Sequence, residues 1–266
     1  MTVAAVAEVA VTFILMIEIS SITFGYPQNA PIFQGFNWRV QRAQTWAILG
    51  SSGCGKTTLL YLLAGLRIPT AGTIEIDGES LTRPRPRSGL ILQDYGLLPW
   101  ATVSENVGLG LRVRDFYGED GKHTPENFQP ENNVEHWLDR LGLNEVADKY
   151  PAQISGGQRQ RTAIARTLAL SPDLLLMDEP FSSLDAITRE DLQNLTLSLC
   201  EEQQLTFVIV THAIEEAVSL GKKILLLNSS PHVFENPNAG QANHRNSREY
   251  NELCNLLWKE MRHEAA

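Results

Sequence analysis

The nine residues from Gly50 to Thr58 read Gly-Ser-Ser-Gly-Cys-Gly-Lys-Thr-Thr. They match the pattern of a glycine, any four residues, and then Gly-Lys-Ser or Gly-Lys-Thr, which builds a phosphate-binding loop. In such a loop, backbone N–H groups and the positive end of the following helix surround phosphate oxygens. Its glycines are needed where φ is positive or where a Cβ would hold the phosphate away. The pattern therefore predicts a nucleotide phosphate site.

Two side chains of this phosphate-binding loop suit specific tasks on a nucleotide. Lys56 supplies a mobile positive charge for the β- and γ-phosphates, and the Thr57 hydroxyl suits a Mg²⁺ ligand. A glycine turn that merely precedes a core helix is the alternative, and a chance match is expected about once in a hundred chains of this length. The residues predicted to surround the phosphates are Gly50, Ser51, Ser52, Gly53, Cys54, Gly55, Lys56, Thr57 and Thr58.

The segments on either side of the loop have the patterns of buried elements. Trp46 to Leu49 is apolar and predicts a buried strand that enters the loop. After the loop, leucines recur at the spacing of a helix that is covered on two sides. Farther upstream, we expect an N-terminal extension over residues 1–16 that leads into a first strand between Ile14 and Phe24.

Polar side chains also follow two other apolar runs. Leu174 to Met177 ends in Asp178 and Glu179, and Phe207 to Val210 is followed closely by His212. The carboxyl ends of parallel strands meet at one edge of a sheet, where ligands bind. Asp178 suits a contact to Mg²⁺, and Glu179 suits a base for an attacking water. An acidic pair alone can be a helix cap and a histidine alone can belong to the core, so the shared edge carries the prediction.

The composition limits the classes of partner. Hydrophobic residues make up 43% and charged residues 20% of the 266-residue chain, as in ordinary globular proteins. The formal net charge of -9 argues against a protein that binds nucleic acid over a wide basic face. Cys54, Cys200 and Cys254 are widely spaced, so they predict neither a disulfide framework nor a zinc site and fit a reducing cytoplasm.

Two further segments stand out by composition. Leu97, Leu98 and Trp100 gather around a proline in a loop, which predicts a docking surface for a partner. A loop packed under the next helix is the alternative. Residues 112–133 are polar and rich in glycine, asparagine and proline, and we expect a mobile insertion with little fixed structure there.

A second glycine-rich helix start lies at Ser155-Gly156-Gly157-Gln158, which we call the signature segment. It has the spacing of a capping box, with serine at the cap and glutamine three residues later. Such a helix start is an anion site, separate from the phosphate-binding loop. Two such anion sites that face each other across a head-to-tail dimer would enclose ATP between two copies.

The order of these motifs resembles that of the ATP-binding subunit of an ABC transporter, over about residues 17–262. The most specific motif is the signature segment, which is preceded here by Ile154 where the family usually has leucine. We expect this change to be harmless. The motifs that follow the family's order are the phosphate-binding loop, Gln93, the signature segment, Leu174 to Pro180, Ser183-Leu184-Asp185 and His212.

The resemblance implies an α/β fold with a P-loop NTPase (RecA-like) core, an antiparallel β subdomain and an inserted α-helical signature subdomain. The core would comprise about residues 17–98 and 171–230, and the helical subdomain about residues 99–170. Residues 231–266 would form a C-terminal helical tail.

The resemblance also implies a role for each motif residue. Tyr26 would stack on adenine, although by spacing alone a packing role is equally open. The residues implied in hydrolysis are Glu179 as the catalytic carboxylate, Gln93 and His212 as sensors of the γ-phosphate, and Lys56. Mg²⁺ would be held by Thr57, Asp178 and Gln93. A second copy would contribute Ser155, Gly156, Gly157 and Gln158 to the bound ATP, and Asp185 would line the dimer seam.

Partners follow from the same resemblance. Tyr150-Pro151-Ala152-Gln153 stands where exporters often carry Thr-Glu-Val-Gly, so the chain resembles a bacterial importer subunit. Gly96 to Val103 and Glu105-Asn106-Val107 resemble the nitrate, sulfonate and taurine group. The implied arrangement is a dimer of ATP-binding subunits, identical or different, that is peripheral on the cytoplasmic face of the inner membrane. It would dock permease subunits near Gln93 to Val107, and a periplasmic or lipoprotein solute-binding protein would act on it indirectly.

Two other functions remain open at this point. A soluble ABC-type ATPase could act on nucleic acid or ribosomes instead of a membrane complex, although we expect no nucleic-acid partner. A P-loop GTPase is a further alternative, but the sequence contains no Asn-Lys-x-Asp motif for reading guanine.

Overall fold

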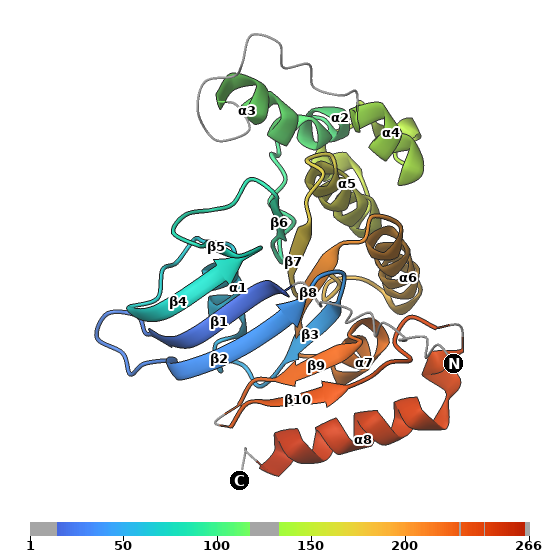
Figure 1. Ribbon diagram of the computed structural model, residues 1–266. Helices are drawn as coiled ribbons and strands as arrows, with labels where there is room; N and C mark the ends of the chain where they lie inside the picture. The colour runs from blue at the N-terminus through green and yellow to red at the C-terminus, as the bar shows by residue number, and fades with distance from the viewer. Residues whose placement is uncertain (1–14, 118–132, 229, 242, 264–266) are drawn as a thin grey trace, which may run out of the picture.

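The computed structural model describes residues 15–117, 133–228, 230–241 and 243–263. Figure 1 shows two β-sheets, helices along one side of the larger sheet, and a further group of helices that projects from one end. This α/β organisation confirms the predicted fold class. No helix within the described ranges is both long and apolar enough to cross a membrane.

The smaller sheet is antiparallel and has the strand order β2-β1-β4-β5. Its strands are β1 (Leu15–Phe24), β2 (Phe33–Gln41), β4 (Ala71–Ile76) and β5 (Glu79–Ser80). Ile17 of β1 pairs with Ile76 of β4, and both side chains are fully buried. Alternating apolar residues thus give this sheet one buried face.

The larger sheet has six strands in the order β10-β9-β3-β8-β7-β6. They are β3 (Thr45–Leu49), β6 (Ser88–Ile91), β7 (Leu174–Asp178), β8 (Thr206–Thr211), β9 (Lys223–Leu226) and β10 (His232–Glu235). All neighbours are parallel except β10, which pairs antiparallel with β9. Every residue of β3, β7 and β8 is buried, as expected for parallel strands covered on both faces.

Helix α1 (Lys56–Leu63) packs between the two sheets. Its leucines, Leu59, Leu60, Leu62 and Leu63, share one core with Ile17 and Ile76 and with Leu174 and Leu176 of β7. The other face of the larger sheet is covered by α5 (Gly156–Leu168), α6 (Ala186–Glu202) and α7 (Ile214–Leu220). The strand ends after β3 and β7 are therefore fixed by cores on both sides.

The projecting group of helices comprises α2 (Val103–Val107), α3 (Leu109–Tyr117) and α4 (Asn133–Arg140), which lie beyond the start of α5 in Figure 1. Short 3-10 turns, η1 (Asn144–Val146) and η2 (Pro151–Gln153), connect α4 to α5. Thr102 and Glu105 form a capping box that starts α2. This group links the loop after β6 to the signature segment.

The expectation of little fixed structure at residues 112–133 is wrong for its first part. Helix α3 continues to Tyr117, and residues 118–132 lie outside the described residues. Gly110 comes so close to Leu170 that an added Cβ would lie 2.8 Å from its Cδ1, and Leu111 packs against the core. Arg112 donates a hydrogen bond to the Glu105 carbonyl at 2.6 Å. These tertiary contacts extend a helix that the polar composition did not predict.

The C-terminal segment contains η3 (His244–Asn246) and α8 (Arg248–His263), a helix that packs on α7. The tail helix was expected from about Asn246. Strand β10 was not predicted, because His232 and Glu235 give it a mixed polar pattern and three of its four residues are exposed. It forms because β9 offers an open edge for antiparallel pairing.

Candidate functional site

The phosphate-binding loop joins β3 to α1 and has the backbone that its glycines predict. Gly53 and Gly55 have φ values of 85° and 105°. A Cβ on Gly55 would lie 2.5 Å from Cγ2 of Ile32, so glycine is needed there for space as well as for conformation. The Lys56 ammonium donates hydrogen bonds to the carbonyls of Gly50 at 2.8 Å and Ser51 at 2.9 Å. The lysine charge is therefore held at the loop before any nucleotide arrives.

Thr57 and Asp178 meet beside the loop. The Thr57 hydroxyl donates a hydrogen bond to Oδ1 of Asp178 at 3.2 Å, which joins the start of α1 to the end of β7. The Asp178 side chain is buried, and this burial raises its pKa, partly offset by the Thr57 hydrogen bond. A buried carboxylate with a raised pKa favours a nearby cation.

The Thr57 and Asp178 oxygens fit Mg²⁺ only in combination with other ligands. Within the described ranges, no group of three or more His, Cys, Asp or Glu side chains could hold a metal ion. Mg²⁺ prefers oxygen ligands and is usually held by one or two carboxylates together with phosphates and water. The pair therefore suits a metal ion that arrives with a nucleotide.

Glu179 and His212 form the second half of this edge. Nδ1 of His212 lies 3.0 Å from Oε2 of Glu179, and their side chains are 60% and 21% exposed. Glu179 has φ of 45°, and its N–H donates to the Val210 carbonyl at 2.9 Å, which ties the end of β7 to β8. A non-glycine residue in this conformation is uncommon and points to a functional constraint.

The signature segment starts α5 as the sequence predicted. The Gln158 N–H donates to Oγ of Ser155 at 3.2 Å, and the Ser155 N–H donates to Oε1 of Gln158 at 2.9 Å, which completes the capping box. A Cβ on Gly157 would lie 2.7 Å from Cγ2 of Thr188 in α6. Gly157 therefore allows close packing of two helices, and Ser155 remains exposed.

Asp185 caps the neighbouring helix α6. Its carboxylate accepts a hydrogen bond from the Thr188 N–H at 3.0 Å, and the hydrogen bonds to Thr188 lower its pKa. Because Thr188 also faces Gly157, the starts of α5 and α6 are built as one unit. Gln93 is exposed beyond the end of β6.

Tyr26 has packing partners in this structure. Its ring meets Phe24 edge to face at 5.3 Å between centroids, and its hydroxyl lies 3.5 Å from Oγ1 of Thr58. The side chain is only partly buried. These contacts place Tyr26 at the phosphate-binding loop, where both a packing role and a stacking role on adenine remain open.

Sequence reasoning missed the side chains that hold the loop after β6. Arg166 of α5 donates to the carbonyls of Tyr95 at 2.8 Å and Gly96 at 2.7 Å, and burial lowers the pKa of its guanidinium. The Tyr95 hydroxyl lies 2.7 Å from Oγ of Ser183. The fully buried Asn106 side chain binds the backbone of the loop at Leu98 and beyond. No spacing of residues in the sequence predicts such long-range contacts.

Comparison with known proteins assigns the family. Residues 33–182 match the family model described as ABC transporter. The chain belongs to the ABC transporter family. The resemblance seen in the sequence is thereby confirmed, and with it the P-loop NTPase core.

Three relatives of this ABC protein are named for the import or transport of small anions. The aliphatic sulfonates import ATP-binding protein of Bacillus anthracis is 34% identical, covering 92% of this chain and 94% of that protein. The bicarbonate transport ATP-binding protein of Synechococcus elongatus is 40% identical, covering 82% of this chain but 32% of that protein. The nitrate import ATP-binding protein of the same species is 43% identical over 70% of this chain and 27% of that protein. The chain thus spans about a third or less of the last two relatives.

One solved structure similar to this chain is a dimer. It is a dimeric ATP-binding cassette in a post-hydrolysis state with ADP and phosphate, with a TM-score of 0.69 and 28% identity. The match covers 82% of this ABC chain and 98% of the solved chain. Nitrate and sulfonate relatives belong to the group predicted from the sequence, and the bicarbonate relative extends it.

Proposed function

We propose that this chain is the ATP-hydrolysing subunit of an ABC importer for a small anion and that it binds ATP between two copies. The observation that carries the proposal is the gathering of Lys56, Thr57, Asp178, Glu179 and His212 at the carboxyl ends of three adjacent strands. Each residue type suits one task in phosphoryl transfer, and the tasks are complementary at this one edge.

The side chains divide the work on ATP. Lys56 exchanges its contacts with the Gly50 and Ser51 carbonyls for phosphate oxygens. Thr57 and Asp178 would hold Mg²⁺, which neutralises phosphate charge when it is bound, and the exposed Gln93 would join them. Glu179 accepts a proton from the attacking water, and its contact with His212 orients it.

The second copy completes the phosphate site in this proposal. Ser155 and Gly157 would face the γ-phosphate held by the partner's phosphate-binding loop, and Gly156 and Gln158 would shape that surface. Asp185 would lie along the seam, since it caps the helix that packs on the signature segment. Tyr26 would contact the adenine. A dimer with a two-fold axis then holds two ATP molecules.

A permease would contact the loop between Gln93 and Val107. Leu97 and Leu98 are partly buried, and Leu97 packs against the core, whereas Trp100 is 74% exposed. An exposed tryptophan on a loop held by buried hydrogen bonds is a rigid anchor for a partner. The names of the relatives favour an anion such as nitrate, bicarbonate or a sulfonate as the solute, carried in by a binding protein and a permease of the inner membrane.

Glu179→Gln tests the chemistry. The amide cannot accept the proton of water, so ATP turnover should fall by about 10²–10⁴-fold while ATP still binds. Glu201→Gln is the matched control, since Glu201 is 65% exposed and pairs with Lys222 on the surface. Unchanged turnover of Glu179→Gln in an ATPase assay would reject Glu179 as the base.

Copurification tests the transport assignment. Trp100→Ala should weaken the recovery of transmembrane partners and leave ATP affinity unchanged, because the side chain is exposed and outside the phosphate site. Recovery of nucleic acid or ribosomes with the wild-type protein would favour the soluble ABC-type ATPase instead.

A further inference from the structure

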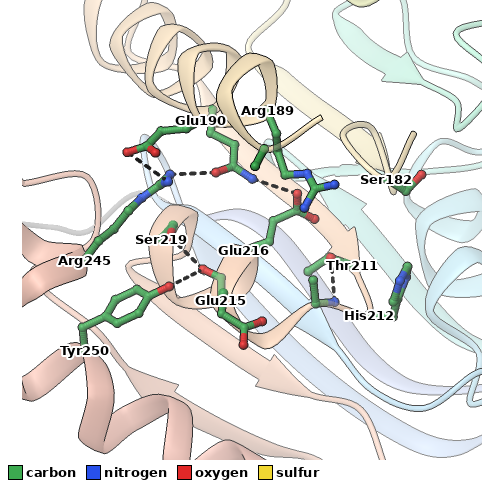
Figure 2. A pocket seen from close by; sticks show the side chains of 13 residues that line it. Ser182, Arg189, Glu190, Thr211, His212, Glu215, Glu216, Ser219, Arg245 and Tyr250 are labelled. Carbon is green, nitrogen blue, oxygen red and sulfur yellow. Dashed lines mark hydrogen bonds and ion pairs between the residues drawn. The ribbon is translucent and has the colours of Figure 1, made fainter. Parts of the chain in front are cut away.

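A polar cavity of about 290 Å³ lies between α6, α7 and the C-terminal segment, and His212 stands on its wall. Figure 2 shows Arg245 and Tyr250 entering this cavity from the C-terminal segment, with Glu216 and His212 on the other side. The Tyr250 hydroxyl donates to the Glu215 carbonyl at 3.1 Å. The C-terminal segment therefore contacts the helix that directly follows His212.

A line of hydrogen bonds crosses this cavity. Nη2 of Arg245 donates to Oε1 of Gln193 at 2.7 Å, and Nε2 of Gln193 donates to Oε1 of Glu216 at 2.9 Å. Gln193 is 3% exposed and Glu216 is 7% exposed. Since guanidinium groups only donate and carboxylates accept, one orientation of the Gln193 amide satisfies both neighbours. Arg245 thus fixes the direction in which Gln193 presents its N–H group.

Glu216 in turn holds the backbone around His212. It lies in the first turn of α7 and lines the cavity together with Thr211 and His212, and the Thr211 hydroxyl is close enough to lower the pKa of its carboxylate. The Ala213 N–H donates to Oγ1 of Thr211 at 3.0 Å. The two chain neighbours of His212 are therefore bonded to each other beside the Glu216 carboxylate.

Because the Glu216 carboxylate is buried, its hydrogen bonding depends on how Arg245 holds Gln193. Burial raises the pKa of Glu216, and the nearby Thr211 hydroxyl and the Gln193 amide lower it in part. An unsatisfied buried charge costs free energy, so a buried carboxylate that loses one hydrogen-bond donor favours a conformation in which another donor reaches it. The Arg189 guanidinium also faces Glu216, but it is held by the carbonyls of Phe181 and Leu184. The Thr211 hydroxyl, directly before His212, is a donor on the adjoining backbone.

We propose that Arg245 is a positioning residue for His212 and that it acts through Gln193 and Glu216. This inference rests on the proposed ATPase function. It makes the C-terminal segment a structural input to the hydrolytic site, although Arg245 touches neither His212 nor the phosphate-binding loop through the bonds described above. Displacement of Arg245 frees Gln193, loosens the start of α7 and lets His212 leave Glu179.

The second contact of Arg245 does not account for such a role. Nη1 of Arg245 lies 3.2 Å from Oε1 of Glu190, whose side chain is 55% exposed. Exposed ion pairs contribute little to stability, about 0–1 kcal/mol. Arg248 supplies the matched control, since it pairs with Glu252 at 2.6 Å on the same segment and its side chain is 87% exposed. Arg245 therefore donates to the buried Gln193, whereas Arg248 pairs with the exposed Glu252.

The test compares Arg245→Met, Arg245→Lys and Arg248→Met in the full chain. Methionine keeps the packing of the long side chain and removes the donors. We expect kcat for ATP to fall about tenfold in Arg245→Met with an unchanged KM, and to remain at the wild-type value in Arg248→Met. Lysine keeps one donor for Gln193, so Arg245→Lys should recover most of the loss.

Hydrogen exchange supplies a readout independent of turnover. Arg245→Met should speed amide exchange across residues 211–216 and leave exchange across residues 49–63 unchanged, whereas Arg248→Met should change neither region. A fall in kcat without faster exchange at 211–216, or faster exchange without a fall in kcat, would overturn the proposal. If the wild-type protein does not hydrolyse ATP, the proposed function fails, and unchanged exchange in Arg245→Met would then refute the positioning link separately.

Discussion

The phosphate-binding loop and the signature segment both have glycines around the start of a helix, yet these glycines meet different physical needs. In the loop, Gly53 and Gly55 have positive φ, a backbone conformation that side chains rarely allow. In the signature segment, Gly157 lies within α5 and makes room for Thr188 of α6. One motif is shaped to receive a ligand, and the other is shaped to hold a helix end in place.

The two regions also differ in what surrounds them. The loop has Asp178 of its own chain within hydrogen-bonding distance of Thr57. Ser155 is exposed, and the hydrogen bonds of its hydroxyl and of its N–H group both go to Gln158 of the same capping box. In the proposed function, the loop would bind the phosphates and the exposed Ser155 would complete the site of a second copy.

The largest effect is expected from the loop. Lys56→Ala removes a charge that is held at the phosphate position by two carbonyls, so ATP affinity should fall about 10- to 100-fold. Titration with a fluorescent ATP analogue measures the change. Lys222→Ala is the control, because the Lys222 side chain is 44% exposed and pairs with Glu201. Equal ATP affinities of Lys56→Ala and Lys222→Ala would show that the loop lysine has no special role in binding ATP.

A smaller effect separates the two kinds of glycine. Gly157→Ala should cost about 1–3 kcal/mol of stability, because its Cβ would lie 2.7 Å from Cγ2 of Thr188. Thr188→Ser removes that methyl group and should restore stability in the double variant. Denaturant unfolding gives both values.

Gly55→Ala is the counterpart in the loop. It combines φ of 105° with a close approach to Cγ2 of Ile32, which alanine at position 32 would remove. Measured against Ile32→Ala alone, Gly55→Ala should therefore keep a residual loss due to backbone strain. Full rescue of Gly55→Ala by Ile32→Ala, or no rescue of Gly157→Ala by Thr188→Ser, would contradict the two roles assigned to these glycines.

The smallest effect concerns stability against pH. The folded-state pKa of Asp178 is raised, so its contribution to stability is fully present below the unfolded pKa and is lost as pH rises through the folded pKa. Asp178→Asn should therefore raise the melting temperature of the nucleotide-free protein at neutral pH, by about 2–4 °C for each kcal/mol gained. The gain should shrink in acid. Thermal scans at several pH values test this, and an unchanged or lower melting temperature at neutral pH would contradict it.

Much of the fold and site followed from local sequence patterns. The glycines and Lys56 predicted the phosphate-binding loop. Continuous apolar runs predicted β7 and β8, and the polar residues after each run marked the ends of these strands. The capping box at Ser155 was also predicted and is confirmed. These features depend on neighbours in sequence, so composition and spacing carry them.

Features that depend on distant partners were not predicted. Helix α3 is fixed by contacts such as that of Gly110 with Leu170, and β10 is fixed by the open edge of β9. The line from Arg245 through Gln193 to Glu216 joins residues far apart in the chain.

The central claim is that Ser155 of one copy completes the phosphate site of another. The most direct measurement is the mass of Glu179→Gln in solution with ATP or with ADP, made with Ser155→Ala or Ser247→Ala added. Ser247 is the matched control because it also accepts a backbone hydrogen bond at a helix start, from Tyr250 at 3.1 Å. We expect a dimer with ATP but not with ADP, weakened by Ser155→Ala and unaffected by Ser247→Ala. A dimer that forms equally with ADP, or one that is insensitive to Ser155→Ala, would contradict the account.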